Sequence, residues 1–456
     1  MMDKTFSIKT LGCKLNQYES SEIANQLLQM GWIAKPFGKR VDIVIVNTCT
    51  VTDRSDKKCR NYIRQGARVS RWGKTIVTGC LAQRDPLSLK RMPEVLEVFG
   101  NNEKGSISSR IEELNNDTFQ TIDDTKSPYC PNPLTKTYSE FKDISHPISS
   151  GGVDNDIEPP VPYFRTRGFM KIQDGCDGEC TYCIIPTVRG IPKSRRYDDI
   201  LEHSRRLIEI GCPEIILTGI SIGRYSDEKK DLAELIKEII ALKGRFRVRI
   251  SSIEPNHINP QLIDLFESER LCPHIHLPIQ SGSDRILQMM KRPYGINDYM
   301  KIIDKIRSRL PDIAIGTDMI VGFPGEGEED FQGSLKLIEE VGFSYVHQFT
   351  YSQRSTTPAS IMKQNCTHGE LLKRKEIMRQ VQKGIGLRYR EKFEGHSLSS
   401  VIEDNRSGEG FSATSDNYIK ISLQESPLNQ KMVGRIVDVH LKRIKIDKNF
   451  GYISSV

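Results

Sequence analysis

The 456-residue sequence predicts an α/β fold in three parts: an N-terminal open parallel sheet, a central partial (β/α)6 barrel and a small C-terminal all-β barrel. Strand-like and helix-like segments alternate in the first and central parts, which is typical of parallel sheets. This periodicity is lost between the two parts. In the last part, short strands separated by turns replace the helices. We therefore expect domains at 1–114, 161–390 and 391–456, with an irregular linker at 115–160.

The composition is that of a globular protein, and the length exceeds that of one ordinary domain. No apolar run approaches the ~20 residues of a membrane span. The first residues lack the apolar core of a signal peptide. We therefore expect a soluble, cytoplasmic protein. The net charge of +7 allows an anionic partner without requiring one.

Eleven cysteines occur in the sequence, an odd number with no regular pairing. In a reducing compartment, such cysteines are more often metal ligands or buried apolar residues than disulfides. Three of them, Cys176, Cys180 and Cys183, stand at C-x-x-x-C-x-x-C spacing and are called the loop triad below. They follow a strand-like run that ends at Gln173, and Tyr182 precedes the last of them.

The loop triad suits a 4Fe-4S cluster, because thiolate is the ligand that binds the irons of such clusters. With three thiolates, the fourth iron has no protein ligand, and such an open position is typical of a catalytic metal site. A structural zinc site would need four ligands, and no fourth one follows. A disulfide would leave one cysteine over and would need an oxidising compartment. The loop therefore predicts an open iron–sulfur site.

The N-terminal part is expected to form strands at 6–10, 41–46 and 75–78 and helices at 18–30 and 53–69. A cysteine follows each strand: Cys13, Cys49 and Cys80, called the N-terminal triad below. Parallel strands have their carboxyl ends at one edge of the sheet, where α/β folds bind ligands, so these cysteines should converge. Three small apolar residues at strand ends are the alternative. Cys59 lies within a helix and is expected not to be a ligand.

The central part is expected to contain six strand–helix units, with the chemistry at the carboxyl ends of the strands. The strands are expected around Met170 and at 215–217, 248–250, 275–277, 313–315 and 345–347, and the helices at 198–210, 231–243, 259–268, 296–309, 328–341 and 369–392. Thr218, Gly219, Ser252 and Gln280 follow such strands and are candidates for binding a cofactor. Each of them also suits an ordinary strand-to-helix turn.

Several other features of the sequence are weaker signals of structure or function. The helix at 369–392 is strongly basic, which indicates either a solvated face or a surface that binds phosphates. Cys212 and Cys272 stand beside strand starts and are expected to be structural, and Cys130 in the linker is given no role. The C-terminal strands are expected at 397–403, 418–422, 431–439 and 441–446. Small barrels of this kind often bind nucleic acid.

The loop triad together with Tyr182 resembles the signature of the radical S-adenosylmethionine (SAM) superfamily. The whole chain resembles one family within it, the methylthiotransferases. The segments that carry this resemblance are 10–13, 46–52 and 77–80 in the N-terminal part and 277–284 and 317–326 in the central part. The order of the parts also resembles that of the family: a methylthiotransferase domain, a radical SAM barrel and a C-terminal TRAM domain.

The resemblance implies two 4Fe-4S clusters and SAM as cofactors. It assigns the SAM-cleaving cluster to the loop triad and an auxiliary cluster, which supplies sulfur, to the N-terminal triad. In the family, one SAM donates a methyl group to sulfur at the auxiliary cluster. A radical made from a second SAM removes hydrogen from carbon 2 of an adenine, and methylthio is transferred there. The resemblance also implies a tRNA substrate, an electron donor and a sulfur source, the last two of unknown identity.

Branches of this family differ in substrate. The segments 12–19, 183–190 and 217–220 are similar to the branch that acts on N6-threonylcarbamoyladenosine at position 37 of tRNA. Isopentenyladenosine in tRNA and an aspartate of a ribosomal protein are the alternative substrates. A non-catalytic iron–sulfur protein that binds RNA is the alternative of another class. Cys59 and Thr187 depart from the family pattern.

Overall fold

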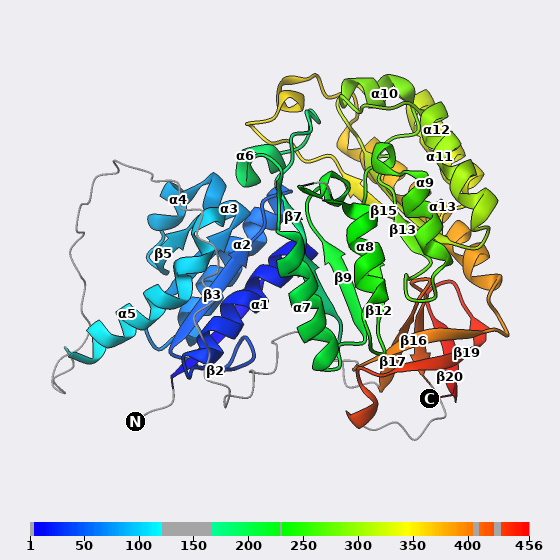
Figure 1. Ribbon diagram of the computed structural model, residues 1–456. Coiled ribbons are helices and arrows are strands. Elements are labelled where there is room, and N and C mark those ends of the chain that lie inside the picture. The colour runs from blue at the N-terminus through cyan, green and yellow to red at the C-terminus, as the bar shows by residue number, and fades with distance from the viewer. Residues whose placement is uncertain (1–3, 121–165, 229, 405–409, 424–429, 456) are drawn as a thin grey trace.

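The computed structural model describes residues 4–120, 166–228, 230–404, 410–423 and 430–455. Figure 1 shows the three predicted parts: the N-terminal sheet with its helices, the partial barrel beside it, and the small barrel below the partial barrel. The α/β fold class is confirmed. Residues 115–120, which were expected to be irregular, are helical, because α5 (Ile107–Gln120) continues to Gln120. Most of the expected linker, including Cys130, lies outside the described residues.

The N-terminal part is a parallel sheet of five strands in the order β2-β1-β3-β4-β5. Three strands were expected: β1 (Thr5–Thr10), β3 (Ile43–Thr48) and β4 (Thr75–Gly79). The two edge strands, β2 (Ile33–Ala34) and β5 (Val95–Phe99), were not. Every residue of β3 is buried, because helices cover both faces of this central strand.

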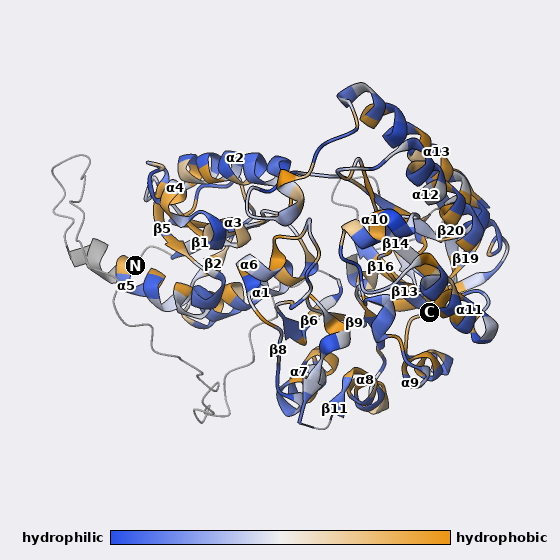
Figure 2. Cartoon of the chain, turned by 90° about the horizontal axis from the view of Figure 1, so that it is seen from above, coloured by the Kyte–Doolittle hydropathy of each residue, from blue (hydrophilic) through white to orange (hydrophobic). Residues whose placement is uncertain are grey.

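Two helices flank this sheet. On one face lies α1 (Lys14–Gln29), and on the other lies α2 (Asp53–Val69), which begins where the Thr52 hydroxyl accepts a hydrogen bond from the Ser55 amide. Figure 2 shows α2 coloured mainly hydrophilic along its length, as expected for a surface helix. The remaining helices of this part are α3 (Cys80–Arg84), α4 (Pro86–Lys90) and the 3-10 turn η1 (Asn101–Ser106).

The partial barrel consists of two parallel three-stranded sheets with helices outside. Its strands are β6 (Gly168–Lys171), β9 (Glu214–Thr218), β12 (Arg247–Ile250), β13 (His274–His276), β14 (Ala314–Val321) and β15 (Tyr345–Thr350). A bridge between Ser252 and His276 joins the two sheets. Within the described ranges, β6 and β15 do not pair, so the barrel is open at the side. The helix α1 of the N-terminal part packs against β6 there.

All six expected strands and the helices between them are present. The helices are α6 (Ile185–Arg189), α7 (Tyr197–Glu209), α8 (Leu232–Ala241), α9 (Pro260–Asp264), α10 (Asp284–Met289), α11 (Ile296–Arg309), α12 (Glu328–Val341) and α13 (His368–Glu391). Two of them, α6 and α10, were not expected. The helix expected at 259–268 is shorter, since α9 ends at Asp264 and a 3-10 turn follows (Leu265–Glu267).

Successive strand residues point to opposite faces of the barrel wall. Those that face the outer helices are apolar, such as Ile215, Leu217, Val248 and Ile250, and they form the main core. Those that face the interior, called the barrel lumen below, are mostly polar. They include Glu214, Arg247, Arg249, Ser251, His274, His276, Asp318, Tyr345 and His347. The lumen is therefore a polar space rather than a hydrocarbon core.

The C-terminal part is a closed barrel in the order β16-β17-β18-β20-β19. Its strands are β16 (Ser397–Asp404), β17 (Phe411–Ser415), β18 (Lys420–Leu423), β19 (Ile436–Ile444) and β20 (Asn449–Ser455). The two strands predicted at 431–439 and 441–446 are one continuous strand, β19, and that prediction was wrong. The pairing of β19 with β20 has two register shifts, between Asp438 and Val439 and between Leu441 and Arg443, on either side of the predicted break. Neither β17 nor β20 was expected.

Several cations of the basic helix α13 pair with groups elsewhere in the protein. Arg374 pairs with Glu326 at 3.0 Å, and Arg390 donates to the backbone oxygens of Lys445 and Ile446. Further ion pairs join Arg379 to Glu376, Lys383 to Asp447 and Lys392 to Asp312. Many of these cations thus hold α13 against both barrels. Among the described residues, no helix has the length and apolar character needed to cross a membrane.

Candidate active site

The three cysteines of the N-terminal triad lie at one edge of the N-terminal sheet. Cys13 precedes α1, Cys49 follows β3, and Cys80 is the first residue of α3. The turns before two of them need glycine, since Gly12 and Gly79 have φ angles of +100° and +98°. A Cβ on Gly12 would lie 2.8 Å from the Cβ and 3.1 Å from the Sγ of Cys49, so Cys49 lies directly against the Gly12–Cys13 turn.

The thiols of this triad are close enough to influence one another electrostatically. Burial raises the pKa of Cys13, and it raises the pKa of Cys49 to about 11. The Cys59 thiol is not directed at the triad: it donates to the backbone oxygen of Cys49 at 3.3 Å and accepts from its amide. A cavity of about 240 Å³ adjoins Cys49 on one side, lined by Lys9, Thr10, Leu11, Gly12, Cys49, Ser55, Lys58 and Tyr62.

The loop that carries the other triad is closed at its base. Gly175, with φ +74°, lies so close to the turn after α6 that a Cβ there would be 2.1 Å from the oxygen of Ile191. The Cys176 amide donates to the oxygen of Gly190 at 2.9 Å. Gln173 is buried, and its side chain donates to the Gly175 oxygen and accepts from the Ser221 amide after β9. Sequence reasoning missed Gln173, whose partners 48 residues away only the fold reveals.

Two donors point at sulfurs of the loop triad. The Gly178 amide donates to Cys176 Sγ at 3.2 Å, and the Arg292 guanidinium donates to Cys180 Sγ at 3.4 Å. Arg292 is nearly fully buried and also contacts the Tyr182 hydroxyl at 3.5 Å. Burial raises the pKa of the Cys183 thiol to about 12. The sequence contains no local signal for Arg292, because it lies more than a hundred residues beyond the loop.

The hydrogen-bond donors beside both triads suit the sulfurs of iron–sulfur clusters. Within the part of the chain that the structure describes, no three Cys, His, Asp or Glu side chains gather closely enough to hold one ion. A cluster needs no such convergence, because each thiolate binds a different iron. Cluster thiolates also accept N–H···S hydrogen bonds. Gly178 and Arg292 supply such donors to the loop triad, and the Asn101 amide group lies 3.9 Å from Cys80 Sγ.

The candidate cofactor residues lie at the carboxyl ends of the barrel strands. Tyr182 packs in an apolar cluster with Ile320 and Phe323 at the end of β14. Gln280 has φ +78°, a strained conformation for a residue other than glycine, and its backbone oxygen accepts from the Ile320 amide. The Ser252 hydroxyl bonds to His276 Nδ1 at 2.7 Å.

Thr218 and Gly219 end β9 beside the base of the loop. Thr218 is buried, and its backbone oxygen accepts a hydrogen bond from the Ile172 amide. A Cβ on Gly219 would lie 2.7 Å from the Gln173 oxygen, so glycine is needed there for chain packing. This contact explains Gly219 without a cofactor.

The two triads adjoin one another across α6. Ile184, the residue after Cys183, packs against Cys80 together with Val188. Asn101 joins the same two segments, because its amide group donates to the Val188 oxygen at 2.7 Å and lies beside Cys80 Sγ. Residues more than a hundred positions apart are thereby held side by side.

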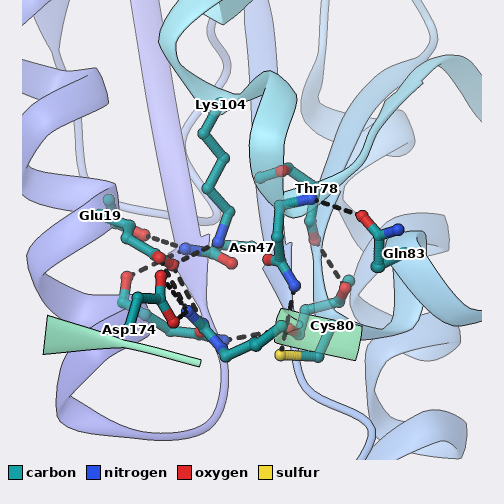
Figure 3. Close-up of polar contacts among 12 residues, drawn as sticks. Glu19, Asn47, Thr78, Cys80, Gln83, Lys104 and Asp174 are labelled. Atoms are coloured by element: carbon teal, nitrogen blue, oxygen red, sulfur yellow. Dashed lines mark hydrogen bonds and ion pairs between the residues drawn. The ribbon is translucent and has the colours of Figure 1, made fainter. Parts of the chain in front are cut away.

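An ionic network fixes this contact between the parts (Figure 3). The Arg189 side chain, 1% exposed, donates to Glu19 at 2.9 Å, to Asp174 at 3.0 Å and to Asn16 at 2.6 Å. Lys104 also pairs with Glu19. Burial alone would raise the pKa of Glu19, but Lys104 and Arg189 lower it to about 2. Glu19 is therefore ionised, and Figure 3 shows it beside Asp174 and the end of the Lys104 side chain.

Comparisons with known proteins agree with this architecture. The model of the radical SAM superfamily matches residues 170–338, and that of the uncharacterized protein family UPF0004 matches residues 5–100.

The threonylcarbamoyladenosine tRNA methylthiotransferase MtaB of Thermotoga maritima is 36% identical over 99% of this chain and 96% of its own length. The MtaB of Bacillus subtilis is 32% identical, with 98% and 96% covered. The tRNA-2-methylthio-N(6)-dimethylallyladenosine synthase of Carboxydothermus hydrogenoformans is 30% identical, with 98% of each chain covered.

Solved structures support the fold. The radical SAM methyltransferase TsrM from Kitasatospora setae superimposes with a TM-score of 0.52 at 14% sequence identity, covering 79% of this chain and 74% of TsrM. The superfamily match implies SAM and a 4Fe-4S cluster as cofactors. Together, the matches over nearly the full length show that the chain belongs to the methylthiotransferase family of radical SAM enzymes, the family that includes the MtaB proteins.

Proposed function

We propose that this protein inserts a methylthio group at carbon 2 of N6-threonylcarbamoyladenosine at position 37 of tRNA. The observation that carries the proposal is the contact between the two cysteine triads, in which Ile184 beside Cys183 packs against Cys80. A site that donates sulfur and a site that activates carbon must share one substrate, so they must adjoin. The similarity to four MtaB proteins at 31–36% identity supports this choice of nucleoside.

The residues that would hold the cofactors are those of the two triads and the carboxyl ends of the barrel strands. The loop triad would hold one 4Fe-4S cluster, and the N-terminal triad, Cys13, Cys49 and Cys80, a second. Tyr182, Thr218, Gly219, Ser252 and Gln280 are the proposed contacts of SAM. When bound, SAM and the clusters supply the radical, the methyl group and the sulfur.

The chain itself orients and shields these groups. Arg292 and the Gly178 amide donate hydrogen bonds to sulfurs of the loop triad, which would tune the electronic properties of its cluster. Gln173 fixes the base of the loop to the end of β9. Arg189 holds the loop segment against α1, and thereby sets the separation of the two triads.

The proposal also includes the partners and the division of the chain. The tRNA is the macromolecular substrate, and an electron donor and a sulfur source of unknown identity complete the reaction in the cytoplasm. From the sequence we infer domains at 1–114, 161–390 and 391–456 with a linker at 115–160, and α5 extends the first domain to Gln120. The sheets support these bounds, since each of them falls within one domain.

A test compares tRNA nucleosides by mass spectrometry in a deletion strain and in the same strain carrying the gene. We expect 2-methylthio-N6-threonylcarbamoyladenosine to be absent from the deletion strain and restored by the gene. Its persistence in the deletion strain would refute the assignment. The same assay detects the 2-methylthio derivative of dimethylallyladenosine, the second candidate product, which the 30% identity to the dimethylallyladenosine synthase makes worth measuring.

The division of labour between the triads can be tested with purified variants reconstituted with iron and sulfide. Cys180→Ala should lose SAM cleavage and about half of the iron, because only the loop triad is broken. Cys80→Ala should also lose about half of the iron but should retain reductive SAM cleavage. Loss of all iron in either variant would contradict two independent clusters.

A further inference from the structure

We infer that Lys14 binds the carboxylate of the threonylcarbamoyl group, and that this side chain selects the substrate nucleoside within the family. The inference rests on the proposed function and deepens it, because it assigns the recognition of the substituent on N6 to one residue. Lys14 is the first residue of α1 and directly follows Cys13 of the N-terminal triad.

The position of Lys14 places its ammonium group in the barrel lumen. The helix α1 packs against β6, beside the lateral opening of the partial barrel. The charge of Lys14 interacts with Arg249 on β12 and with Glu214 on β9. It also interacts with His274 on β13 and with His347 on β15, across the lumen from β9. Only a side chain that enters the lumen lies near all four of these strands.

Lys14 differs from the arginines around it in having no partner. The guanidinium of Arg249 donates to Glu214 at 2.8 Å, and that of Arg247 donates to Glu214 at 2.7 Å. Arg167 contacts both Glu214, at 3.3 Å, and Glu403, at 3.0 Å. In the described part of the chain, Lys14 makes neither a hydrogen bond nor an ion pair. Its ammonium is therefore available to a ligand, whereas the arginines are already committed.

Other polar atoms on the lumen side of the strands also lack a partner. Ser251 is 6% exposed and His274 is 1% exposed, yet the Ser251 hydroxyl and His274 Nδ1 make no hydrogen bond among the described residues. Buried polar groups are usually paired, so unpaired ones that face a shared space indicate a polar ligand. The lumen side of the strands thus offers a cation and additional hydrogen-bonding groups.

The chemistry of the substituents decides which nucleoside fits. The threonylcarbamoyl group carries one carboxylate, one hydroxyl and a urea linkage to N6, whereas a dimethylallyl group is a hydrocarbon without polar atoms. A hydrocarbon placed in this lumen would exclude water from the Lys14 ammonium without replacing its hydrogen bonds, which is costly. A carboxylate would pair with it through a charge-assisted hydrogen bond. The lumen therefore favours the acidic substituent.

The test measures binding of anticodon stem-loop RNAs to the reconstituted enzyme by fluorescence anisotropy. Three RNAs are compared, with N6-threonylcarbamoyladenosine, with its carboxamide and with dimethylallyladenosine at position 37. The wild-type protein should bind the carboxylate RNA about ten- to a hundredfold more tightly than the carboxamide RNA. Lys14→Met should abolish most of this difference, and Lys14→Arg should preserve most of it.

The control is Lys39→Gln, which removes the charge of an exposed lysine in the loop between β2 and β3. If losing a positive charge only reduces the general attraction to phosphates, this variant should bind all three RNAs more weakly by the same factor. If Lys14→Met weakened the binding of the carboxylate and carboxamide RNAs by the same factor, the inference would be overturned. Equal binding of both RNAs by the wild-type protein would also overturn it, and this result needs no variant to fold.

Failure of the inference and failure of the proposed function are distinguishable. If the wild-type enzyme makes the methylthio derivative of threonylcarbamoyladenosine but does not sense its carboxylate, only the role of Lys14 is refuted. If it makes no such product, the proposed function itself fails. Iron content and the cluster absorption spectrum of each Lys14 variant show that the neighbouring Cys13 site is intact.

Discussion

Arg189 is the residue through which the two triads are held together. Its guanidinium lies between Glu19 of the N-terminal part and Asp174 at the base of the cysteine loop. Removing a single partner from a buried ion pair leaves an uncompensated charge, which typically costs about 3–5 kcal/mol. The Arg189 guanidinium also donates to the side-chain oxygen of Asn16. The side-chain amide of Asn16 in turn donates to the backbone oxygens of Leu11 and Thr48, at the carboxyl ends of β1 and β3.

We predict that Arg189→Met lowers the free energy of unfolding by about 3 kcal/mol, because Glu19 then stays buried with fewer cations. Chemical denaturation measures this change. Arg205→Met is the control: its pair with Glu202 is exposed, so the loss should stay below about 1 kcal/mol. In the double variant Arg189→Met/Glu19→Gln, the loss should be smaller than the sum of the two single losses. Additive losses would show that the two side chains act independently.

At the scale of elements, most of the expected strands and helices were confirmed, and these are the segments with a clear pattern of apolar residues. Short apolar runs predicted β9, β12 and β14, and the basic helix expected at 53–69 was confirmed as α2 at its observed ends. Edge strands such as β5 escaped prediction because they alternate weakly. The continuous strand β19 was wrongly divided into two strands, although its pairing with β20 runs along its whole length with two register shifts.

The interface of α1 and α7 contains a histidine that should make stability depend on pH. His203 on α7 lies beside Tyr18 on α1, with ring centroids 6.2 Å apart. Burial and the neighbouring cations Arg195 and Arg206 lower its pKa to about 4. The unfolded chain has the ordinary histidine pKa of about 6.5. Between these values, the unfolded chain binds a proton that the folded protein does not, so stability falls as the pH falls from about 6.5 to about 4.

We predict that His203→Gln removes about 2 kcal/mol of this acid destabilisation, a figure reduced for the partial exposure of the ring. The measurement is the difference in unfolding free energy between the variant and the wild-type protein at pH 8 and at pH 4.5. The difference should move in favour of the variant as the pH falls. A pH-independent difference would mean that His203 titrates normally in the folded protein. Comparing the two proteins cancels other groups, including Glu22, whose pKa burial raises.

At the scale of the whole molecule, one carboxylate ties the partial barrel to the C-terminal barrel. Glu214 is fully buried at the base of the lumen and accepts hydrogen bonds from Arg247 and Arg249. The same arginines donate to backbone oxygens of the C-terminal barrel, at Ser399, Thr414, Ser415 and Asp416. The C-terminal barrel therefore closes the base of the lumen, opposite the cysteine loop.

We predict that Glu214→Gln lowers the free energy of unfolding by about 3–5 kcal/mol, because the arginines lose their shared counter-charge. It should also increase amide hydrogen exchange in β16 and β17, since the arginines that grip these strands lose their orientation. Glu202→Gln, which breaks only exposed pairs with Arg205 and Arg206, serves as the control. Unchanged exchange in β16 and β17 would contradict the proposed link between the barrels.

The sequence by itself determined the α/β fold class, the family and the two sets of cysteines, because these depend on local spacing and periodicity. Cysteines of one short loop lie close together because of their spacing. Cysteines that follow neighbouring parallel strands lie close together because these strands end at the same edge of the sheet. Only the tertiary structure revealed Gln173, Arg189 and Arg292, whose partners are distant in the chain. The direction of Lys14 was equally hidden, since the lumen that it enters is formed by strands from another part of the chain. Whether the charge of Lys14 has a partner depends on groups that are distant in the sequence. Its role in substrate recognition is therefore decided by the fold.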